Sequence, residues 1–241
     1  MFRRKKKNLA GPDLLTELPL ALPSEEGDVL LTCKPEVVDN LRRMITRIMQ
    51  TEEFPAKLAL ISSLRGEGVT YISRAMATVM AHDLARSVCI VDLNWQFPSE
   101  PLVPTHQSYG LAAALAGQAT VDEIIVRTGK PNLAWVPAGE IDMPSRPIVA
   151  RSSALAEVIN ELSQQFDHLL FDVPAILSSS DSIALASLAD ASCMVIKHGV
   201  TSIENVRLAL DDVNHLRILG VLMNQVNLQT PSLLLRFIPQ A

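Results

Sequence analysis

The sequence lacks any apolar run that could cross a membrane, and it has only three cysteines. No stretch approaches the roughly 18 uncharged apolar residues of a spanning helix. No apolar signal-peptide segment accompanies the basic N-terminus, which favours a cytoplasmic location. Cys33, Cys89 and Cys193 show neither disulfide nor metal spacing. Cys89 and Cys193 fall in expected strands, so we interpret them as reduced core residues.

Positive charge is scarce outside the first seven residues. Arg3–Lys7 carries five positive charges, which leaves sixteen basic and twenty-six acidic side chains in residues 8–241, a net charge of −10. An acidic body argues against a nucleic-acid partner. The basic tip could bind anionic lipid at the inner face of the plasma membrane, at roughly 1 kcal/mol per charge. The alternative for this tip is a solvated tail.

Apolar runs typical of strands alternate with helical patterns from residue 35 onward. The expected strands are 58–61, 88–92, 133–136, 168–172, 191–197 and 218–224. Short helices are expected over 110–116 and 121–127, a proline-rich loop is expected after 133–136, and Thr201 with Glu204 forms a capping box that opens a helix. This order predicts an α/β fold, a doubly wound, mostly parallel sheet with helices on both faces. We expect a tail and linker over residues 1–34, one domain over 35–228 and a C-terminal tail over 229–241. The apolar stretch Leu233–Ile238 in that tail is either a docking segment or an element packed on the body.

The strongest local pattern is a glycine-rich turn between a strand and a helix. Leu58–Ile61 reads as a buried strand, Ser62–Thr70 as the turn, and the apolar positions after it repeat at helical spacing. This is the context of a phosphate-binding loop, where backbone N–H groups and the helix N-terminus attract an anion. A tight packing turn is the alternative. The position before Thr70, where such loops carry lysine, holds Val69.

Polar residues gather where the expected strands end. Ligands of parallel sheets bind outside the carboxyl ends of the strands, and that edge collects the loop, Asp92, Asp172 and Asn224. A phosphate-bound Mg²⁺ needs a loop hydroxyl and nearby carboxylates, which Thr70, Asp92 and Asp172 can supply.

Several motifs together point to a family. They are Gly66-Glu67-Gly68-Val69-Thr70, Val91-Asp92-Leu93-Asn94-Trp95-Gln96-Phe97-Pro98, Asp172-Val173-Pro174-Ala175 with Asp181, and Leu219–Asn224. Over about residues 29–228 the chain resembles the cytoplasmic kinase domain of bacterial tyrosine kinases from capsule and exopolysaccharide systems. These are P-loop NTPase-like proteins related to septum-positioning and chromosome-partition ATPases. Val69, Asn94 and Gln96 depart from the family pattern.

The resemblance implies a site and partners. The implied ligands are ATP or ADP with Mg²⁺, and the implied catalytic residues are Asp92 and Asp172. The implied partner is a membrane-bound polysaccharide chain-length regulator or co-polymerase. A homo-oligomer is also implied, because Asp39 and Arg42 lie near a family element used in ring assembly. The implied cofactor-binding residues are Ser63, Arg65, Gly66, Glu67, Gly68, Thr70, Tyr71 and Asn224. Asn224 matches the asparagine that contacts adenine in the family.

The departures from the family pattern all weaken the expected kinase chemistry. Loss of the lysine should weaken nucleotide binding ten- to a hundredfold, because charge-assisted bonds are worth roughly 1.5–3 kcal/mol. Autophosphorylating members carry a C-terminal tyrosine cluster, whereas this chain has only Tyr71 and Tyr109. The leading interpretation is a degenerate kinase-like regulator or scaffold of polysaccharide assembly. The alternatives are a working ATPase or tyrosine kinase, with Arg65 or a partner's residue replacing the lysine, and a membrane-positioning ATPase.

Overall fold

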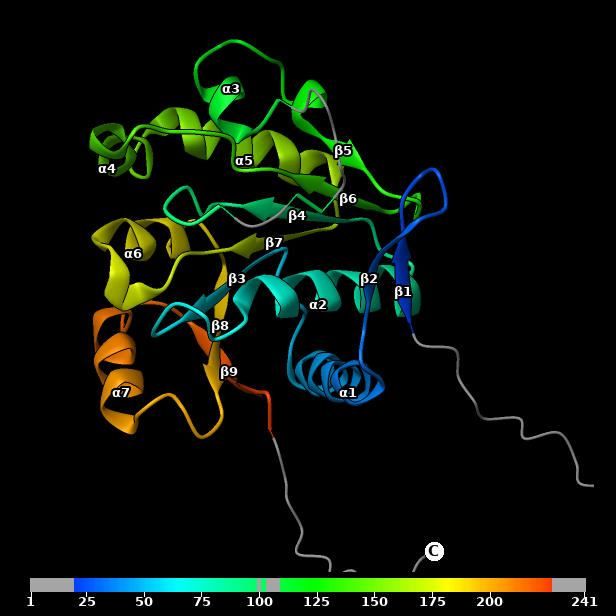
Figure 1. Cartoon of the computed structure of the whole chain (residues 1–241), viewed down its shortest axis with the longest axis vertical. Helices are drawn as coiled ribbons and strands as arrows, with labels where there is room; N and C mark the ends of the chain where they lie inside the picture. Colours follow the sequence, from blue (N-terminus) through cyan, green and yellow to red (C-terminus); the bar gives the residue numbers. More distant parts are fainter. Residues whose placement is uncertain (1–19, 99–100, 103–108, 227–241) are drawn as a thin grey trace, which may run out of the picture.

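The computed structural model describes residues 20–98, 101–102 and 109–226, and its centre is a seven-stranded sheet (Figure 1). The strand order is β5-β6-β4-β7-β3-β8-β9, and every neighbouring pair is parallel except β5 with β6. The strands are β3 (Lys57–Ser62), β4 (Val88–Asp92), β5 (Val126–Arg127), β6 (Leu133–Val136), β7 (His168–Asp172), β8 (Ala191–Lys197) and β9 (Ile218–Asn224). The helices are α1 (Pro35–Thr51), α2 (Val69–Asp83), α3 (Leu111–Leu115), α4 (Arg146–Val149), α5 (Ser153–Gln165), α6 (Ser180–Ala186) and α7 (Ile203–Asp212), with 3₁₀ turns η1 (Asp122–Ile124), η2 (Met143–Ser145) and η3 (Ile176–Ser178).

Both faces of the sheet are buried, which confirms the predicted doubly wound α/β class. In the central strand β3, Leu58 and Leu60 belong to the core beneath α1 and α2, while Ala59 and Ile61 belong to the opposite core, which includes residues of α3, α5, α6 and α7. Successive side chains of a strand point to opposite faces, so a strand covered on both sides must be apolar throughout. This is why the apolar runs located the main strands.

The N-terminal region departs from the expected linker. The strands β1 (Ala21–Pro23) and β2 (Val29–Thr32) pair antiparallel, with Gly27 at a φ of 94° in the connecting turn. Leu22 is buried, and the Gly129 N–H donates to the Pro23 carbonyl at 2.8 Å. The prediction of a linker is therefore wrong for this segment, because Leu22 and its neighbours contribute to the core. Residues 1–19 lie outside the described part.

Three local expectations also differ from the structure. The segment Val121–Arg127, expected as a short helix, forms η1 and then β5. The proline-rich loop after β6 contains η2 and α4. Thr201 is not the N-cap of α7. Ser202 holds that place and accepts a hydrogen bond from Asn205 N.

Two sequence expectations on the chain as a whole can be compared with the structure. Cys33, Cys89 and Cys193 are all free and buried, as expected of Cys89 and Cys193. Within the described ranges, no helix is both long and apolar enough to span a membrane.

Candidate functional site: a loop at the carboxyl edge of the sheet

The loop between β3 and α2 has the backbone of an anion-binding turn. Gly66 and Gly68 have φ values of 85° and 95°, in the left-handed region that glycine adopts without strain. Gly68 is also the N-cap of α2, so the chain enters the helix directly from the loop. A Cβ atom at Gly68 would collide with Asn224 Nδ2, so this position accepts only glycine without rearrangement.

Glu67 braces this loop from the side away from the pocket. Its side chain is buried, and its Oε2 accepts hydrogen bonds from the backbone N–H groups of Ser63 (2.8 Å) and Leu64 (3.1 Å). Its Oε1 accepts from the Thr201 hydroxyl, which itself accepts from Lys197 N at 3.0 Å. The loop is thereby fixed to the end of β8. Thr201 was expected to cap α7, and this contact explains its different role.

Asn224 fixes the same loop to the end of β9. Its Nδ2 donates to the Glu67 carbonyl at 2.8 Å, and its Oδ1 accepts from Gln225 N at 2.9 Å. The side chain is buried. The carboxamide thus holds the loop backbone, and its expected contact with adenine stays a prediction.

Two aspartates meet beside the start of α2. Asp92 ends β4 and Asp172 ends β7, and the parallel register places them directly opposite one another. Both are buried. Burial, and after it the charge of Asp92, raises the pKa of Asp172 to about 7, although a hydrogen bond from Thr70 and the charge of Arg74 act in the opposite direction. Among the described residues, Asp172 Oδ1 has no hydrogen-bond partner.

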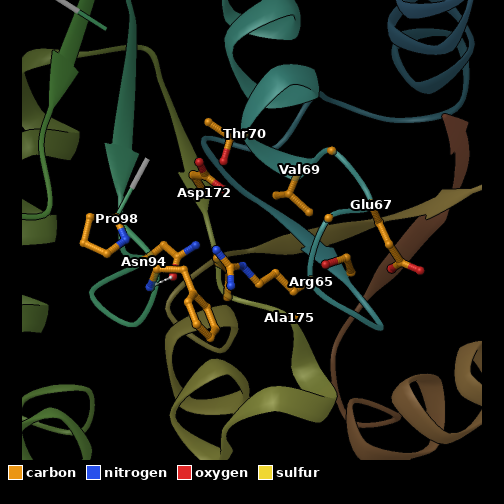
Figure 2. Close-up of a pocket in the computed structure, with 13 residues that line it drawn as sticks. Arg65, Glu67, Val69, Thr70, Asn94, Pro98, Asp172 and Ala175 are labelled. Carbon is orange, nitrogen blue, oxygen red and sulfur yellow. Dashed lines mark hydrogen bonds between the residues drawn. The ribbon is translucent and has the colours of Figure 1, made fainter. Parts of the chain in front are cut away.

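These parts surround a cavity of about 280 Å³ (Figure 2). Figure 2 shows Arg65 reaching across it toward Asn94, while Glu67 points the opposite way. The Arg65 guanidinium lies over the Phe97 ring, 4.0 Å from its centroid. The lining residues are Ser62, Arg65, Gly66, Glu67, Gly68, Val69, Thr70, Asn94, Phe97, Pro98, Asp172, Val173 and Ala175.

The structure brings together most of the predicted site residues, but not all of them. Four lie elsewhere: Ser63, Tyr71, Asp92 and Asn224 do not line the cavity. Ser63 has a buried hydroxyl without a partner in the described part of the chain. Tyr71 points toward the start of α1, where its hydroxyl accepts from Lys34 N at 3.2 Å. Asp92 lies behind the cavity, beside Asp172.

Two side chains near the cavity were missed by the sequence analysis. Arg74 acts electrostatically on Asp172, and its position four residues after Thr70 places both on one face of α2. That spacing could have identified it. Phe97 contacts Arg65, but it lies in a loop, so no periodic pattern could have indicated that contact.

The element expected to act in ring assembly lies on α1, away from this site. Arg42 forms an ion pair with Asp83 of α2 at 2.7 Å and lies 3.7 Å from Asp39. These contacts join α1 to α2, and the homo-oligomer stays a prediction.

Sequence relatives of the chain include bacterial tyrosine kinases. It is 27% identical over 173 residues to the tyrosine-protein kinase CpsD of Streptococcus agalactiae, covering 70% of this chain and 75% of that protein. It is 26% identical over 162 residues to the tyrosine-protein kinase Wzc of Salmonella typhimurium. That match covers 66% of this chain but only 22% of Wzc.

Solved structures share the fold. The kinase domain of the Escherichia coli tyrosine kinase ETK superposes with a TM-score of 0.72 at 20% identity, covering 81% of this chain and 78% of that one. The septum site-determining protein MinD of Pyrococcus horikoshii, crystallised with Mg-ADP, superposes with a TM-score of 0.56 at 21% identity, covering 75% and 76%. The fold is therefore that of P-loop NTPases.

A family model covers most of the described domain. The family described as cellulose biosynthesis protein BcsQ matches residues 56–233, a range that contains the glycine loop, both aspartates and Asn224. The predicted resemblance to bacterial tyrosine kinases is confirmed by the sequence relatives. The chain belongs to the family of the cellulose biosynthesis protein BcsQ and is similar in sequence to the bacterial tyrosine-protein kinases CpsD and Wzc.

Proposed function

We propose that this protein is a kinase-like regulator or scaffold of polysaccharide assembly in which nucleotide chemistry is weakened. The observation that carries the proposal is Val69, a buried valine that lines the cavity immediately before Thr70. A valine offers no positive charge to a phosphate. Since a charge-assisted contact contributes roughly 1.5–3 kcal/mol, we expect Mg-ATP to bind ten- to a hundredfold more weakly than it would with lysine there.

The surrounding residues still fit a magnesium ion. Thr70 provides a hydroxyl, and the buried Asp172 has an Oδ1 atom without a partner in the described residues. Hard cations prefer such oxygen ligands, and a bound cation would relieve the repulsion between Asp92 and Asp172. When bound, Mg²⁺ would neutralise phosphate charge. Here the Asp172 carboxylate and the Thr70 hydroxyl would position it next to the glycine loop.

The resemblance implies an acid at position 94 that helps to activate the attacking hydroxyl, and this chain has asparagine there. Asn94 lines the cavity, and its Oδ1 accepts a hydrogen bond from Phe97 N at 3.0 Å. An amide is neutral at every working pH, so Asn94 cannot take a proton from an attacking hydroxyl as an aspartate could. Its observed contact instead shapes the turn after β4. We therefore expect these substitutions to weaken nucleotide binding less than they weaken phosphoryl transfer.

A regulator needs a partner, and the names of the relatives suggest what kind of protein this partner is. The relatives named above are tyrosine kinases, and a further relative, 28% identical over 177 residues, is the succinoglycan biosynthesis transport protein ExoP of Rhizobium meliloti. We infer that this chain docks on a membrane-bound chain-length regulator or co-polymerase at the cytoplasmic face. The braced loop would then serve as a rigid surface rather than as a catalyst.

Genetic complementation tests this proposal. In a strain of the source organism that lacks the gene, the wild-type protein and Asp172→Asn should restore polysaccharide production equally, because a scaffold does not need the carboxylate. Glu157→Gln, on an exposed part of α5, is the matched control. Immunoblots must show equal protein levels. Restoration by the wild type and the control but not by Asp172→Asn would contradict the proposal.

One observation favours a second candidate, a working ATPase or tyrosine kinase. Arg65 lies in the cavity, and only its stacking on Phe97 holds the guanidinium in the observed position among the contacts described. Such stacking is worth about 0.5–1 kcal/mol at exposed sites, less than a charge-assisted bond to phosphate. Arg65 could therefore exchange Phe97 for a phosphate. Under this candidate Arg65→Ala would lower ATP affinity about tenfold or more, whereas our proposal expects little change.

A further inference from the structure

Strand β9 forms one end of the seven-stranded sheet. It pairs with β8 on one side, and within the described ranges no strand pairs with its other side. Figure 1 shows β9 at the margin of the sheet. An edge of this kind presents N–H and C=O groups with which a further strand can pair.

The strand at the other end of this sheet, β5, has protections that β9 lacks. β5 has only two residues and ends in the charged Arg127. β9 has seven residues, and residues 218–226 contain no charged side chain and no proline. Short length, charge and proline are common protections of an edge strand against pairing. β9 therefore has the properties of a strand that accepts a partner.

The register identifies which backbone groups face the open edge. Asn224 directs its backbone toward β8, since its carbonyl accepts a hydrogen bond from His198 N at 2.9 Å. Backbone direction alternates along a strand, so Leu222 also faces β8, whereas Val221 and Met223 direct their N–H and C=O groups to the open edge. These two residues are therefore the ones that can pair.

The same two residues carry exposed apolar side chains. Val221 is 46% exposed and Met223 is 55% exposed. They are two positions apart, so their side chains lie on one face of the strand. Leu222, between them, packs against the core beneath α1 and α2. Gln225 has a φ of 56°, a left-handed conformation that turns the chain directly after the strand.

We propose that β9 pairs antiparallel with β9 of a second copy of this chain, about a twofold axis at Leu222. Val221 would lie opposite the partner's Met223, and Met223 opposite the partner's Val221. Residues opposed in this way exchange both of their N–H···O=C bonds, so every outward backbone group of the two residues would find a partner. The facing side chains are apolar and no like charges meet, which makes the strand complementary to its own copy.

This pairing would determine where the two glycine loops lie in the dimer. Asn224 at the end of β9 holds the Glu67 carbonyl of the loop at 2.8 Å. The two copies of β9 would run in opposite directions, so the two loops would lie at opposite edges of one joined sheet. Each loop would then remain accessible to a separate partner.

Sedimentation equilibrium of the full chain and two double variants tests the pairing. In Val221→Lys/Met223→Lys, like charges would face each other across the twofold axis. In Val221→Lys/Met223→Glu, opposite charges would face each other in the proposed register. Both variants change the same two exposed positions, so each is the matched control of the other, and circular dichroism checks that both fold. All three proteins keep the apolar stretch Leu233–Ile238, which lies outside the described residues.

The wild type and Val221→Lys/Met223→Glu should approach twice the mass of one chain as the protein concentration rises. For Val221→Lys/Met223→Lys we expect the dissociation constant of the dimer to rise roughly tenfold or more, because like charges placed opposite each other suppress association. In the wild type, amide exchange of Val221 and Met223 should slow with increasing concentration. The Leu222 amide, which faces β8, should not change and is the internal reference.

Three outcomes would overturn the proposal. A wild type that stays monomeric at about 100 µM would mean that β9 does not pair with a second copy. Equal masses of the two double variants would mean that any dimer uses another surface or another register. Slow exchange of Val221 and Met223 at every concentration would mean that the edge is covered within one chain.

Discussion

Replacing Asp172 by asparagine should stabilise the protein above neutral pH and flatten its pH profile. Burial, together with the charge of Asp92, raises the pKa of Asp172 from 3.8 to about 7. Between these values the folded protein holds one more proton than the unfolded chain. The free energy of unfolding therefore falls by about 1.4 kcal/mol for each pH unit of increase within that window. Over the whole window the loss is about 4 kcal/mol, and it is complete above the folded pKa.

The asparagine variant isolates this effect because it keeps the size of the side chain and an acceptor for the Thr70 hydroxyl. Urea unfolding of the wild type and the variant between pH 5 and pH 8, followed by tryptophan fluorescence, gives the two profiles. The variant should gain stability relative to the wild type as pH rises, and the gain should level off near pH 8. The Glu157→Gln control should follow the wild type. A constant difference between wild type and Asp172→Asn would refute the raised pKa.

Three further predictions follow from the loop, the tyrosines and the basic tip. Glu67→Ala should lower the free energy of unfolding by about 2–4 kcal/mol, because two backbone N–H groups and a hydroxyl lose their acceptor. A urea midpoint unchanged from that of the exposed-site control Glu157→Ala would contradict it. Incubation with labelled ATP and Mg²⁺ should label neither Tyr71, whose hydroxyl is engaged by Lys34 N, nor Tyr109, and labelling that Asp172→Asn abolishes would show kinase activity. If Arg3–Lys7 bind lipid, sedimentation with anionic vesicles should decrease with salt, since charges are screened over about 10 Å at 0.1 M, and equal binding to neutral vesicles would exclude this role.

The main strands could be predicted because each is buried on both faces. A strand such as β7, whose last four residues are buried, leaves a continuous apolar run that ends at Asp172. The short elements left no such signal. β5 has two residues, and β1 and β2 have three and four, too few for a periodic pattern.

The candidate site, like the fold, could be predicted only in part from the sequence. The loop and both aspartates could be placed because parallel strands bring their carboxyl ends to one edge. The contacts that hold the loop could not be predicted, because the partners of Glu67 are 134 and 157 positions away from it in the sequence. Thr201 shows the limit most clearly. Its spacing to Glu204 is typical of a capping box, but its hydroxyl forms hydrogen bonds with Glu67 and Lys197, so Ser202 caps α7.

Calorimetric titration with Mg-ATP tests the central claim most directly. The comparison needs the wild type, Val69→Lys, and Val69→Leu as a control that changes size without adding charge. The wild type and Val69→Leu should bind weakly or not at all. Val69→Lys should bind ten- to a hundredfold more tightly than the wild type, because the loop, Thr70 and Asp172 are otherwise in place. Tight, sub-micromolar binding by the wild type, unimproved by the lysine, would contradict a weakened nucleotide site.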